Sequence, residues 1–401
     1  MFSMDTLFQD LDPQQKTPSW QRRLLKILFR EKEFHRFADQ YQHLKGIDMA
    51  EQVLEHFNIR CELTERDREQ IPSYGPVVIV ANHPIGTLDG LAILHAVASV
   101  RPDVKVVANQ LLSLVSSLGS LMIPVDNMGN RTRRNQVTQM QEHLANQGVM
   151  IVFPAGEVSR MSTKGVRDGK WHTGFIRLAA KARAPVVPVH ISGSNSALFY
   201  LSSMIYRPLS TLLLVHEMFG QRGNSLTLKI GARIPYTSWH DGQMQAGDLA
   251  ARFRKHLYRL GAGKPGLFHT ETSIARAEDR AVLKHALEAS EVLGKTPDGK
   301  MIYLYRRHGE DTVPILRELG RLREIAFRAV GEGSGRRRDL DCYDDDYYHL
   351  VLCDPHALEL VGAYRFIPTA VQVSSQGLDG IHSRSLFPYR QSPDQLLAQG
   401  T

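Results

Sequence analysis

Cysteine is scarce in this sequence, with three residues among 401, at Cys61, Cys342 and Cys353. No two of them have the spacing of zinc ligands, and three cysteines cannot build a disulfide framework. We therefore expect a reducing compartment and no metal site.

Long uncharged apolar runs are also missing. None reaches the roughly 18 residues that a membrane-spanning helix needs, and the most apolar stretch, 197–214, is interrupted by Arg207 and Pro208. The N-terminus carries acidic residues instead of a basic segment followed by an apolar one, so no signal peptide is expected. Zinc-finger spacings and RNA-binding aromatic motifs do not occur, which argues against a nucleic-acid partner.

The composition is that of a folded protein, with 42% apolar and 23% charged residues. Its length suggests two domains, or three. The net charge of +7 favours anionic partners, namely nucleic acid, anionic lipid surfaces or acidic substrates, without choosing among them. Residues 18–58 are predicted to be helical, with an apolar stripe and many basic residues around it. Such a helix suits an anionic membrane surface, or else packs on its own domain with the basic face in water.

From residue 76 onward, short β-branched runs alternate with helical stretches. The expected strands are 76–81, 104–108, 150–153, 186–190 and 226–230, and the expected helices lie around 89–99, 110–121, 132–147 and 174–183. This alternation predicts an α/β fold with a mostly parallel twisted sheet flanked by helices. A second unit follows, with strands at 301–305, 349–353 and 361–366 and a helix over 312–330. In parallel sheets, the chemistry usually lies at the carboxyl ends of the strands.

The strongest motif, Asn82-His83-Pro84-Ile85-Gly86-Thr87-Leu88-Asp89, follows the apolar run that ends at Ala81. An aspartate near a histidine can fix the tautomer of a general base and stabilise its protonated form. No Ser or Cys lies in a nucleophile elbow, so the histidine would activate a substrate hydroxyl or amine directly. The alternative is a loop histidine followed by an aspartate that caps a helix.

A second group of motifs follows later strands. Phe153-Pro154-Ala155-Gly156-Glu157 is followed by Arg160 and Lys170, which are candidate anion-binding residues. Asp126 and Asn127 come after another apolar run, with Arg131 just beyond them. Each lone arginine can also be an ordinary surface charge.

Taken in order, these motifs resemble the glycerolipid (lysophosphatidate-type) acyltransferase family, which carries an N-H-x4-D block, an arginine-bearing block, an F-P-E-G block and a V-P-V strand. The resemblance implies transfer of a fatty acyl group from acyl carrier protein or coenzyme A to the hydroxyl of a lyso-lipid, with no bound cofactor. His83 would be the general base and Asp89 its orienting carboxylate. Substrate binding would involve a larger set, comprising Asn82, Gly86, Asp126, Asn127, Arg131, Phe153, Pro154, Gly156, Glu157, Arg160 and Lys170.

Two departures from the family pattern narrow the resemblance. Five residues separate His83 from Asp89 where the family has four, and Ala155 replaces the usual Glu, with Glu157 two places later. Both variants resemble the branch of ornithine-lipid O-acyltransferases and hemolysin-like acyltransferases. That branch implies an acceptor with an amino-acid head group, and a peripheral protein on the cytoplasmic face of the inner membrane, in contact with its anionic surface.

The C-terminal unit resembles the opening half of acyl-homoserine-lactone synthases and ornithine N-acyltransferases, which share the GNAT fold. The resemblance rests on Arg323, Phe327, Asp339, Asp341, Asp344 and Arg365, which would shape a pocket for an acceptor amine. A solvated acidic loop with a structural arginine is the alternative. The later pyrophosphate-binding loop of a GNAT domain is not found in 366–401, so we expect a partial domain.

The predicted organisation is thus an N-terminal amphipathic helical region (1–58), an acyltransferase-like domain (59–258), a linker with a helix (259–300) and a partial GNAT-like domain (301–401). The leading hypothesis is a lyso-lipid O-acyltransferase of ornithine-lipid or related aminolipid synthesis. One alternative is a lysophospholipid acyltransferase whose C-terminal unit is not catalytic. The other is a non-catalytic, hemolysin-like lipid-binding protein.

Overall fold

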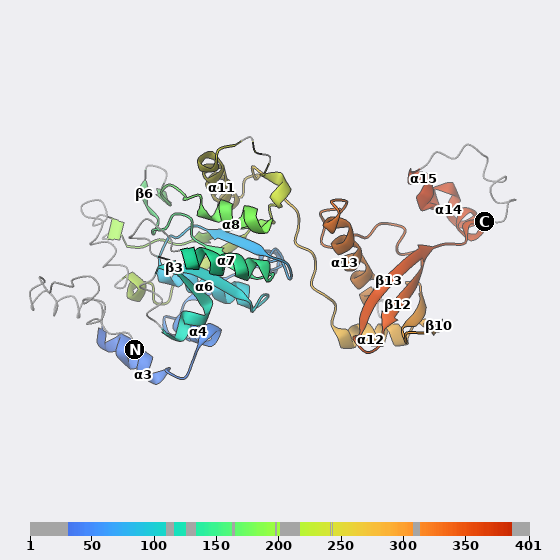
Figure 1. Cartoon of the computed structure of the whole chain (residues 1–401), viewed down its shortest axis with the longest axis horizontal. Coiled ribbons are helices and arrows are strands. Elements are labelled where there is room, and N and C mark those ends of the chain that lie inside the picture. Colours follow the sequence, from blue (N-terminus) through green and yellow to red (C-terminus); the bar gives the residue numbers. More distant parts are fainter. Residues whose placement is uncertain are drawn as a thin grey trace, which may run out of the picture. The chain divides into compact units, whose positions relative to one another are not determined.

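The computed structural model describes residues 31–109, 116–125, 134–162, 165–196, 199–200, 217–240, 242, 244–307 and 313–386. The chain divides into two compact units, Met1–Ser273 and Ile274–Thr401 (Figure 1). The division falls inside the segment 259–300, which was expected to be a linker. The later part of that segment supplies a helix and a strand to the second unit.

The first unit is built on a seven-stranded sheet in the order β1-β9-β8-β2-β5-β3-β4. Its strands are β1 (Arg60–Glu62), β2 (Val77–Ala81), β3 (Val104–Asn109), β4 (Met122–Val125), β5 (Val149–Val152), β8 (Val186–Ser192) and β9 (Ser225–Ile230). All neighbouring strands are parallel except β8 and β9, which are antiparallel. The prediction of a mostly parallel α/β sheet is therefore confirmed, and β1 and β4 are additions to the predicted strands.

Helices cover both faces of this sheet. They are α3 (Glu31–Gln40), α4 (Gly46–His56), α5 (Glu65–Arg68), α6 (Thr87–Ala98), α7 (Arg134–Ala145), α8 (Gly174–Ala182) and α11 (Ala246–Gly261), with 3-10 turns η2 (Ser116–Leu121) and η3 (Tyr236–Ser238). Of the helix predicted over 18–58, residues 31–40 and 46–56 are helical, and 18–30 lie outside the described residues. Of the helix predicted over 110–121, the described part is η2.

The β2 side chains alternate between the two faces, as they must in an extended strand. Val77 and Ile79 pack in one core, with side chains of α4 and α6. Val78 and Val80 pack in the other core, with side chains of α7, α8 and α11. Because both faces are buried, all five β2 residues are apolar, which is why the sequence shows a continuous run.

The second unit is a four-stranded antiparallel sheet in the order β10-β11-β12-β13. Its elements are α12 (Arg280–Glu288), β10 (Glu291–Lys295), β11 (Met301–Tyr305), α13 (Val313–Ala329), β12 (Tyr348–Asp354), β13 (Glu359–Phe366), α14 (Thr369–Gln376), η4 (Gly377–Gly380) and α15 (His382–Leu386). Apolar residues of α12 and α13 pack with Tyr305, Val351 and Leu360 of the sheet. The three predicted strands and the predicted helix of this unit are confirmed. Within the described residues, no helix of either unit combines the length and apolar character needed to cross a membrane.

Two histidines of the first unit, the buried His256 and the half-buried His190, make its stability depend on pH. Burial, together with nearby cations, lowers the pKa of both His190 and His256 to about 4. The Nδ1 atom of His256 accepts a hydrogen bond from the Leu267 N–H, which requires that nitrogen to be unprotonated. These histidines are therefore neutral in the folded state across the range in which an unfolded chain takes up protons.

We expect the free energy of unfolding of the first unit to fall as the pH drops below about 6.5 towards 4. Between pH 6.5 and 5, the free energy of unfolding should fall by about 1.5 kcal/mol for each histidine, because the histidine binds a proton in the unfolded chain and stays neutral in the folded chain. Urea unfolding at pH 7.5, 6 and 5 measures this slope. His256→Gln, which cannot be protonated, should flatten it, and an unchanged slope would contradict the assignment.

Candidate active site

His83 lies just beyond the carboxyl end of β2, and its ring is paired with a carboxylate of α6. The Nδ1 atom lies 3.2 Å from Oδ2 of Asp89. The Asp89 side chain is fully buried, whereas the His83 side chain is 20% exposed. The His83 ring also packs against Phe153, which follows β5, with 4.3 Å between ring centroids. Phe153 thus contacts the imidazole ring, Asp89 lies at its Nδ1 atom, and part of the His83 side chain remains open to a ligand.

Gly86 accommodates the additional residue between His83 and Asp89. It adopts φ = +124° directly before the first residue of α6, a conformation that is strained for residues with a Cβ. This bend brings the N–H groups of Ile85 and Gly86 to 2.8 and 3.0 Å from Asp89 Oδ2. The loop thus wraps around the carboxylate, and the His–Asp pair forms despite the longer spacing.

Asp168 is a second buried carboxylate that fixes the backbone of His83. Its Oδ1 accepts hydrogen bonds from the His83 N–H, at 3.2 Å, and from the Ser159 hydroxyl, at 2.5 Å. Its Oδ2 accepts from the Trp171 indole, and the Ser159 N–H donates to the His83 carbonyl. Burial raises the pKa of Asp168, against the hydrogen bonds from Ser159 and Trp171 that lower it. Both backbone groups of His83 are therefore held by the segment that follows β5.

Two asparagines link the loop around His83 to β8 and to the segment that follows β8. The side chain of Asn82, which was expected to contact substrate, is buried and exchanges two hydrogen bonds of 2.8 Å with the backbone of Ile191. Asn195 donates to the carbonyls of Pro84 and Ile85. The amide of Asn82 therefore ties the ends of β2 and β8 together, and this positions the residue that follows it.

The loop from Phe153 to Arg160 lies beside His83, through the contact of Phe153 with its ring. Pro154 is buried, and Glu157 pairs with Arg160 at 3.0 Å, so the charges of these two side chains offset one another. Gly156 adopts φ = +67°, and a Cβ there would lie 3.6 Å from the ring of His172. Lys170 is exposed. Asp126, Asn127 and Arg131 lie outside the described residues.

The residues that sequence reasoning missed are those that act across long separations. Asp168 is 85 residues from His83, and Asn195 is 110 residues from Ile85. Asp168 lies two residues before Lys170, which the sequence marks as a candidate anion-binding residue. In a sequence, an Asp followed by a Gly is typical of an exposed turn, so nothing marks Asp168 as a buried residue.

In the second unit, the predicted acceptor-pocket acids are paired with arginines. Asp344 Oδ1 accepts from Arg323 and Arg365, at 2.8 and 2.7 Å, and its Oδ2 accepts from the Asp341 N–H. Arg365 also forms a two-point contact with Asp341, and this contact lowers the pKa of Asp341 against its burial. Arg323 lies 3.3 Å from Asp339. The three acids and two arginines therefore form one network.

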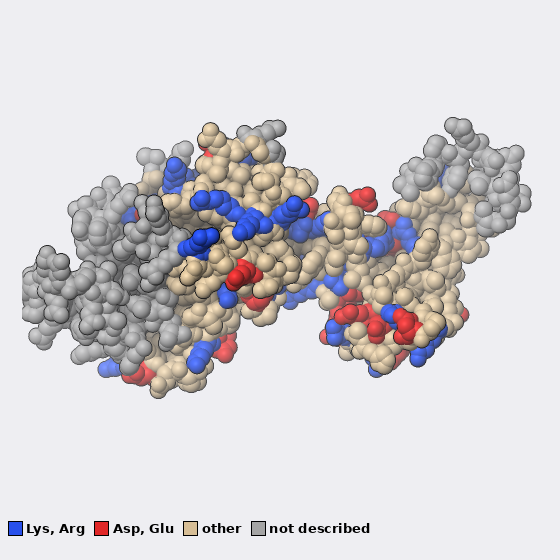
Figure 2. All heavy atoms as spheres, in the orientation of Figure 1, with Lys and Arg blue, Asp and Glu red and all other residues tan. Residues whose placement is uncertain are grey.

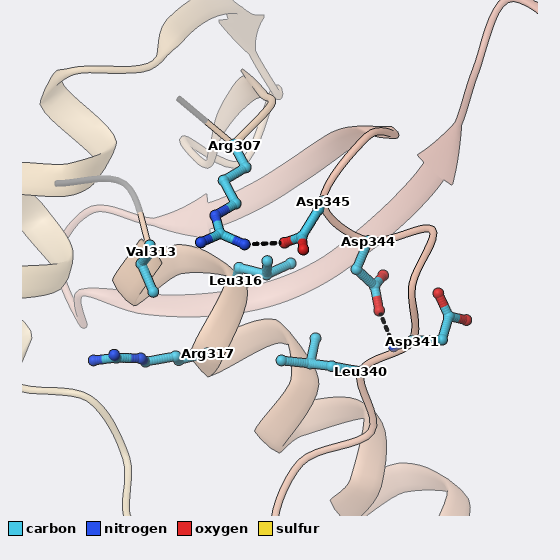
Figure 3. A pocket seen from close by; sticks show the side chains of 8 residues that line it. All are labelled: Arg307, Val313, Leu316, Arg317, Leu340, Asp341, Asp344 and Asp345. Carbon is cyan, nitrogen blue, oxygen red and sulfur yellow. Dashed lines mark hydrogen bonds and ion pairs between the residues drawn. The ribbon is translucent and has the colours of Figure 1, made fainter. Parts of the chain in front are cut away.

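A pocket of about 290 Å³ lies beside this network (Figure 3). Asp341 and Asp344 line it, together with the Arg307–Asp345 ion pair and apolar side chains that include Leu316 and Leu340. Asp339, Arg323 and Arg365 are not among its lining residues. Phe327 is 41% exposed on α13 and is likewise not part of the lining. The structure thus brings two of the six predicted residues to the pocket.

Comparison with known proteins follows this division of the chain. A family model described as "Acyltransferase" matches residues 15–260, and one described as "Acetyltransferase (GNAT) domain" matches residues 322–400. The chain is 28% identical over 243 residues to a lyso-glycine lipid O-acyltransferase of Bacteroides thetaiotaomicron. The aligned region covers 59% of this chain and 88% of that protein. It is 48% identical over 79 residues to a glycine N(alpha)-acyltransferase of the same organism, covering 19% of this chain and 23% of that protein.

Among solved structures, the chain is similar to the 1-acyl-sn-glycerophosphate acyltransferase PlsC of Thermotoga maritima, at 18% identity and a TM-score of 0.37. The alignment covers 60% of this chain and 95% of that one. The likeness at this score does not bear on function. The first family model spans more than half of the chain. The chain is an acyltransferase, a member of the family described by that model, and carries a GNAT-type domain at its C-terminal end.

Proposed function

We propose that the first unit transfers a fatty acyl group from an acyl thioester, carried by coenzyme A or acyl carrier protein, to the hydroxyl of a lyso-lipid. The observation that carries the proposal is the pairing of a partly open His83 ring with the buried Asp89 carboxylate, at the carboxyl edge of a parallel sheet. Relatives named as lyso-glycine lipid O-acyltransferases support the same reaction class.

In the proposed mechanism, Nε2 of His83 takes the proton of the acceptor hydroxyl as its oxygen bonds to the thioester carbonyl carbon. Asp89 holds Nδ1 and stabilises the imidazolium that forms. Backbone N–H groups at the strand ends stabilise the oxyanion. The carbon–sulfur bond then breaks, and the imidazolium returns the proton to the departing thiolate. No acyl-enzyme forms along this route.

We further propose that the acceptor has an amino-acid head group. The chain is similar to lyso-glycine lipid O-acyltransferases over 243 residues and to glycine N(alpha)-acyltransferases over 79 residues, and both kinds of relative are named for glycine or for a glycine lipid. The names of these relatives favour glycine, whereas sequence analysis had predicted ornithine. The match to the N-acyltransferases covers about a quarter of their length, so we propose no N-acyl transfer by the second unit.

The test is transfer of a labelled acyl group from acyl carrier protein and from coenzyme A to three acceptors, in separate reactions. Lyso-glycine lipid and lyso-ornithine lipid represent amino-acid head groups, and lysophosphatidate represents a phosphate head group. We expect label in one or both of the first two products and little in the third. Transfer to lysophosphatidate alone would replace the proposed acceptor, and transfer to none would remove the proposed function.

A further inference from the structure

A strongly basic pocket of about 570 Å³ lies in the first unit, apart from the His83 ring. Five cationic residues line it, with no acidic residue among the described lining, and the ring of Tyr258 forms part of the wall. The cations are Arg167 of β7 (Gly165–Arg167), Arg254, Lys255 and Arg259 of α11, and Lys264 beyond the end of α11. Of these, only Arg259 lies in the last turn of α11, where it complements the helix dipole, so the dipole alone does not explain this concentration of charge.

The pocket lies at the same edge of the sheet as His83. The end of α11 packs over the end of β8, since a Cβ at Gly261 would come within 2.5 Å of the His190 ring. His190 follows Val189, which is paired with Ala81 at the end of β2. The pocket is therefore on the carboxyl side of the strands, where the acyl group must be transferred.

Asp168 connects the pocket to the candidate active site. Its carboxylate accepts from the His83 N–H, while its own N–H donates to the Tyr258 hydroxyl, at 2.7 Å, and its carbonyl accepts from Arg254. Burial, together with the Asp168 charge, raises the pKa of Tyr258 to about 12, so Tyr258 is a neutral part of the wall. Asp168 alone would therefore separate a ligand held by these cations from the backbone of His83, the proposed base.

Another part of the surface of the first unit is also basic. Figure 2 shows a row of Lys and Arg side chains across one face of the first unit, at the level of α8. Two cationic residues of α8, Arg177 and Lys181, are exposed. Arginine binds phosphate in a two-point geometry, and a field of one sign draws anionic ligands towards a cleft.

We propose that this basic pocket binds the phosphate-bearing end of the acyl donor, with the pantetheine arm running past Asp168 to His83. The inference rests on the proposed function, because it takes the donor to be an acyl thioester of coenzyme A or of acyl carrier protein. Both donors carry a phosphorylated pantetheine, and they differ in what lies beyond it: a phosphorylated nucleotide in the first, a protein in the second. The volume of the pocket suits a ligand of nucleotide size.

The test compares two charge-matched variants of the full chain. Lys255→Glu/Lys264→Glu reverses two exposed cations of the pocket, and Arg60→Glu/Arg66→Glu reverses two exposed cations on β1 and α5. Binding of coenzyme A, of 3′-phosphoadenosine 5′-phosphate and of holo acyl carrier protein is measured by calorimetry, without turnover. We expect the pocket variant to bind the donor at least about tenfold more weakly, and the control variant to bind within about twofold of the wild type.

The pattern of losses identifies the source of the phosphate. Weaker binding of coenzyme A and of the nucleotide assigns the pocket to coenzyme A, and weaker binding of the carrier protein alone assigns it to the carrier. Unchanged donor affinity in the pocket variant overturns the proposal, as does a wild type that binds neither donor. So does a loss of binding to phosphatidylglycerol vesicles with donor affinity retained, which would assign the cations to a membrane surface.

Two controls keep the inference separate from the proposed function. His83→Ala should retain donor binding while losing transfer, so failure of the proposed function appears in the transfer assay and failure of the pocket appears in the binding assay. If the glutamate pair does not fold, as judged by circular dichroism, Lys255→Ala/Lys264→Ala is used in its place. For that pair we expect a smaller loss, about threefold, and an unchanged affinity overturns the proposal in the same way.

Discussion

Replacement of His83 by alanine is expected to lower kcat for acyl transfer by about 10²- to 10⁴-fold. A positioned general base contributes an effect of this size, and the variant leaves the acceptor hydroxyl with no group to take its proton. The KM values for donor and acceptor should change little, because the base acts mainly in the transition state. Steady-state kinetics with each substrate varied in turn measures both quantities.

The matched variant for this experiment is His83→Gln, which retains much of the shape of the side chain and a hydrogen-bonding group. The backbone of residue 83 is held by Ser159 and Asp168, independently of the side chain, so neither variant should unfold the loop. If glutamine restores activity to near the wild-type level, proton transfer is not the role of this residue. A rise in KM with kcat intact would assign His83 to acceptor binding instead.

Asp89 should behave differently from His83, because it has two partners in addition to the ring. Its Oδ2 accepts from two backbone N–H groups, and the side chain has no exposed area. Asp89→Asn keeps the shape and one acceptor oxygen, but removes the charge that stabilises the imidazolium. Its effect on kcat should therefore be accompanied by a loss of thermal stability, which His83→Ala should not show.

The parts of the fold that were predicted correctly are those with a local physical cause. β2 and β8 are buried on both faces, and their continuous apolar runs are a direct result. β1 has three residues, two of them exposed and charged, and pairs only with β9, so nothing local marks it. The antiparallel pairing of β8 with β9 likewise depends on a connection that the sequence does not reveal.

The candidate site likewise combines one local feature with several long-range contacts. His83 and Asp89 are six positions apart on one loop and one helix, and a local motif could suggest their pairing. Asp168 and Asn195 reach this loop from distant segments, and Asn82 faces β8 instead of the open side. In the second unit, the acidic motif was visible, but its neutralisation by two arginines depended on the packing of α13 and β13.

Loss of Asp344 is expected to destabilise the second unit by about 3 to 5 kcal/mol while leaving O-acyl transfer intact. Asp344 is 1% exposed and holds both Arg323 and Arg365, so Asp344→Ala leaves two partly buried guanidinium groups without their shared carboxylate. Removal of one partner from a buried ionic network costs this much because the remaining charges stay desolvated. The N–H of Asp341 would lose its acceptor as well.

Hydrogen–deuterium exchange of the full chain measures this effect in the unit where it arises. Peptides from α13 and β12 should exchange faster in Asp344→Ala, and peptides from β2 and α6 should exchange as in the wild type. Asp345→Ala is the matched control, because Asp345 is an exposed neighbour that pairs with Arg307 among the described residues, and exposed pairs contribute less than about 1 kcal/mol. If instead Asp344→Ala folds normally but loses binding of an amine ligand, the acids serve as the acceptor site that the sequence predicted. Equal exchange in both variants, with no change in ligand binding, would show that the network contributes neither to the stability of the second unit nor to ligand binding. The experiment therefore separates a structural cluster from a binding site.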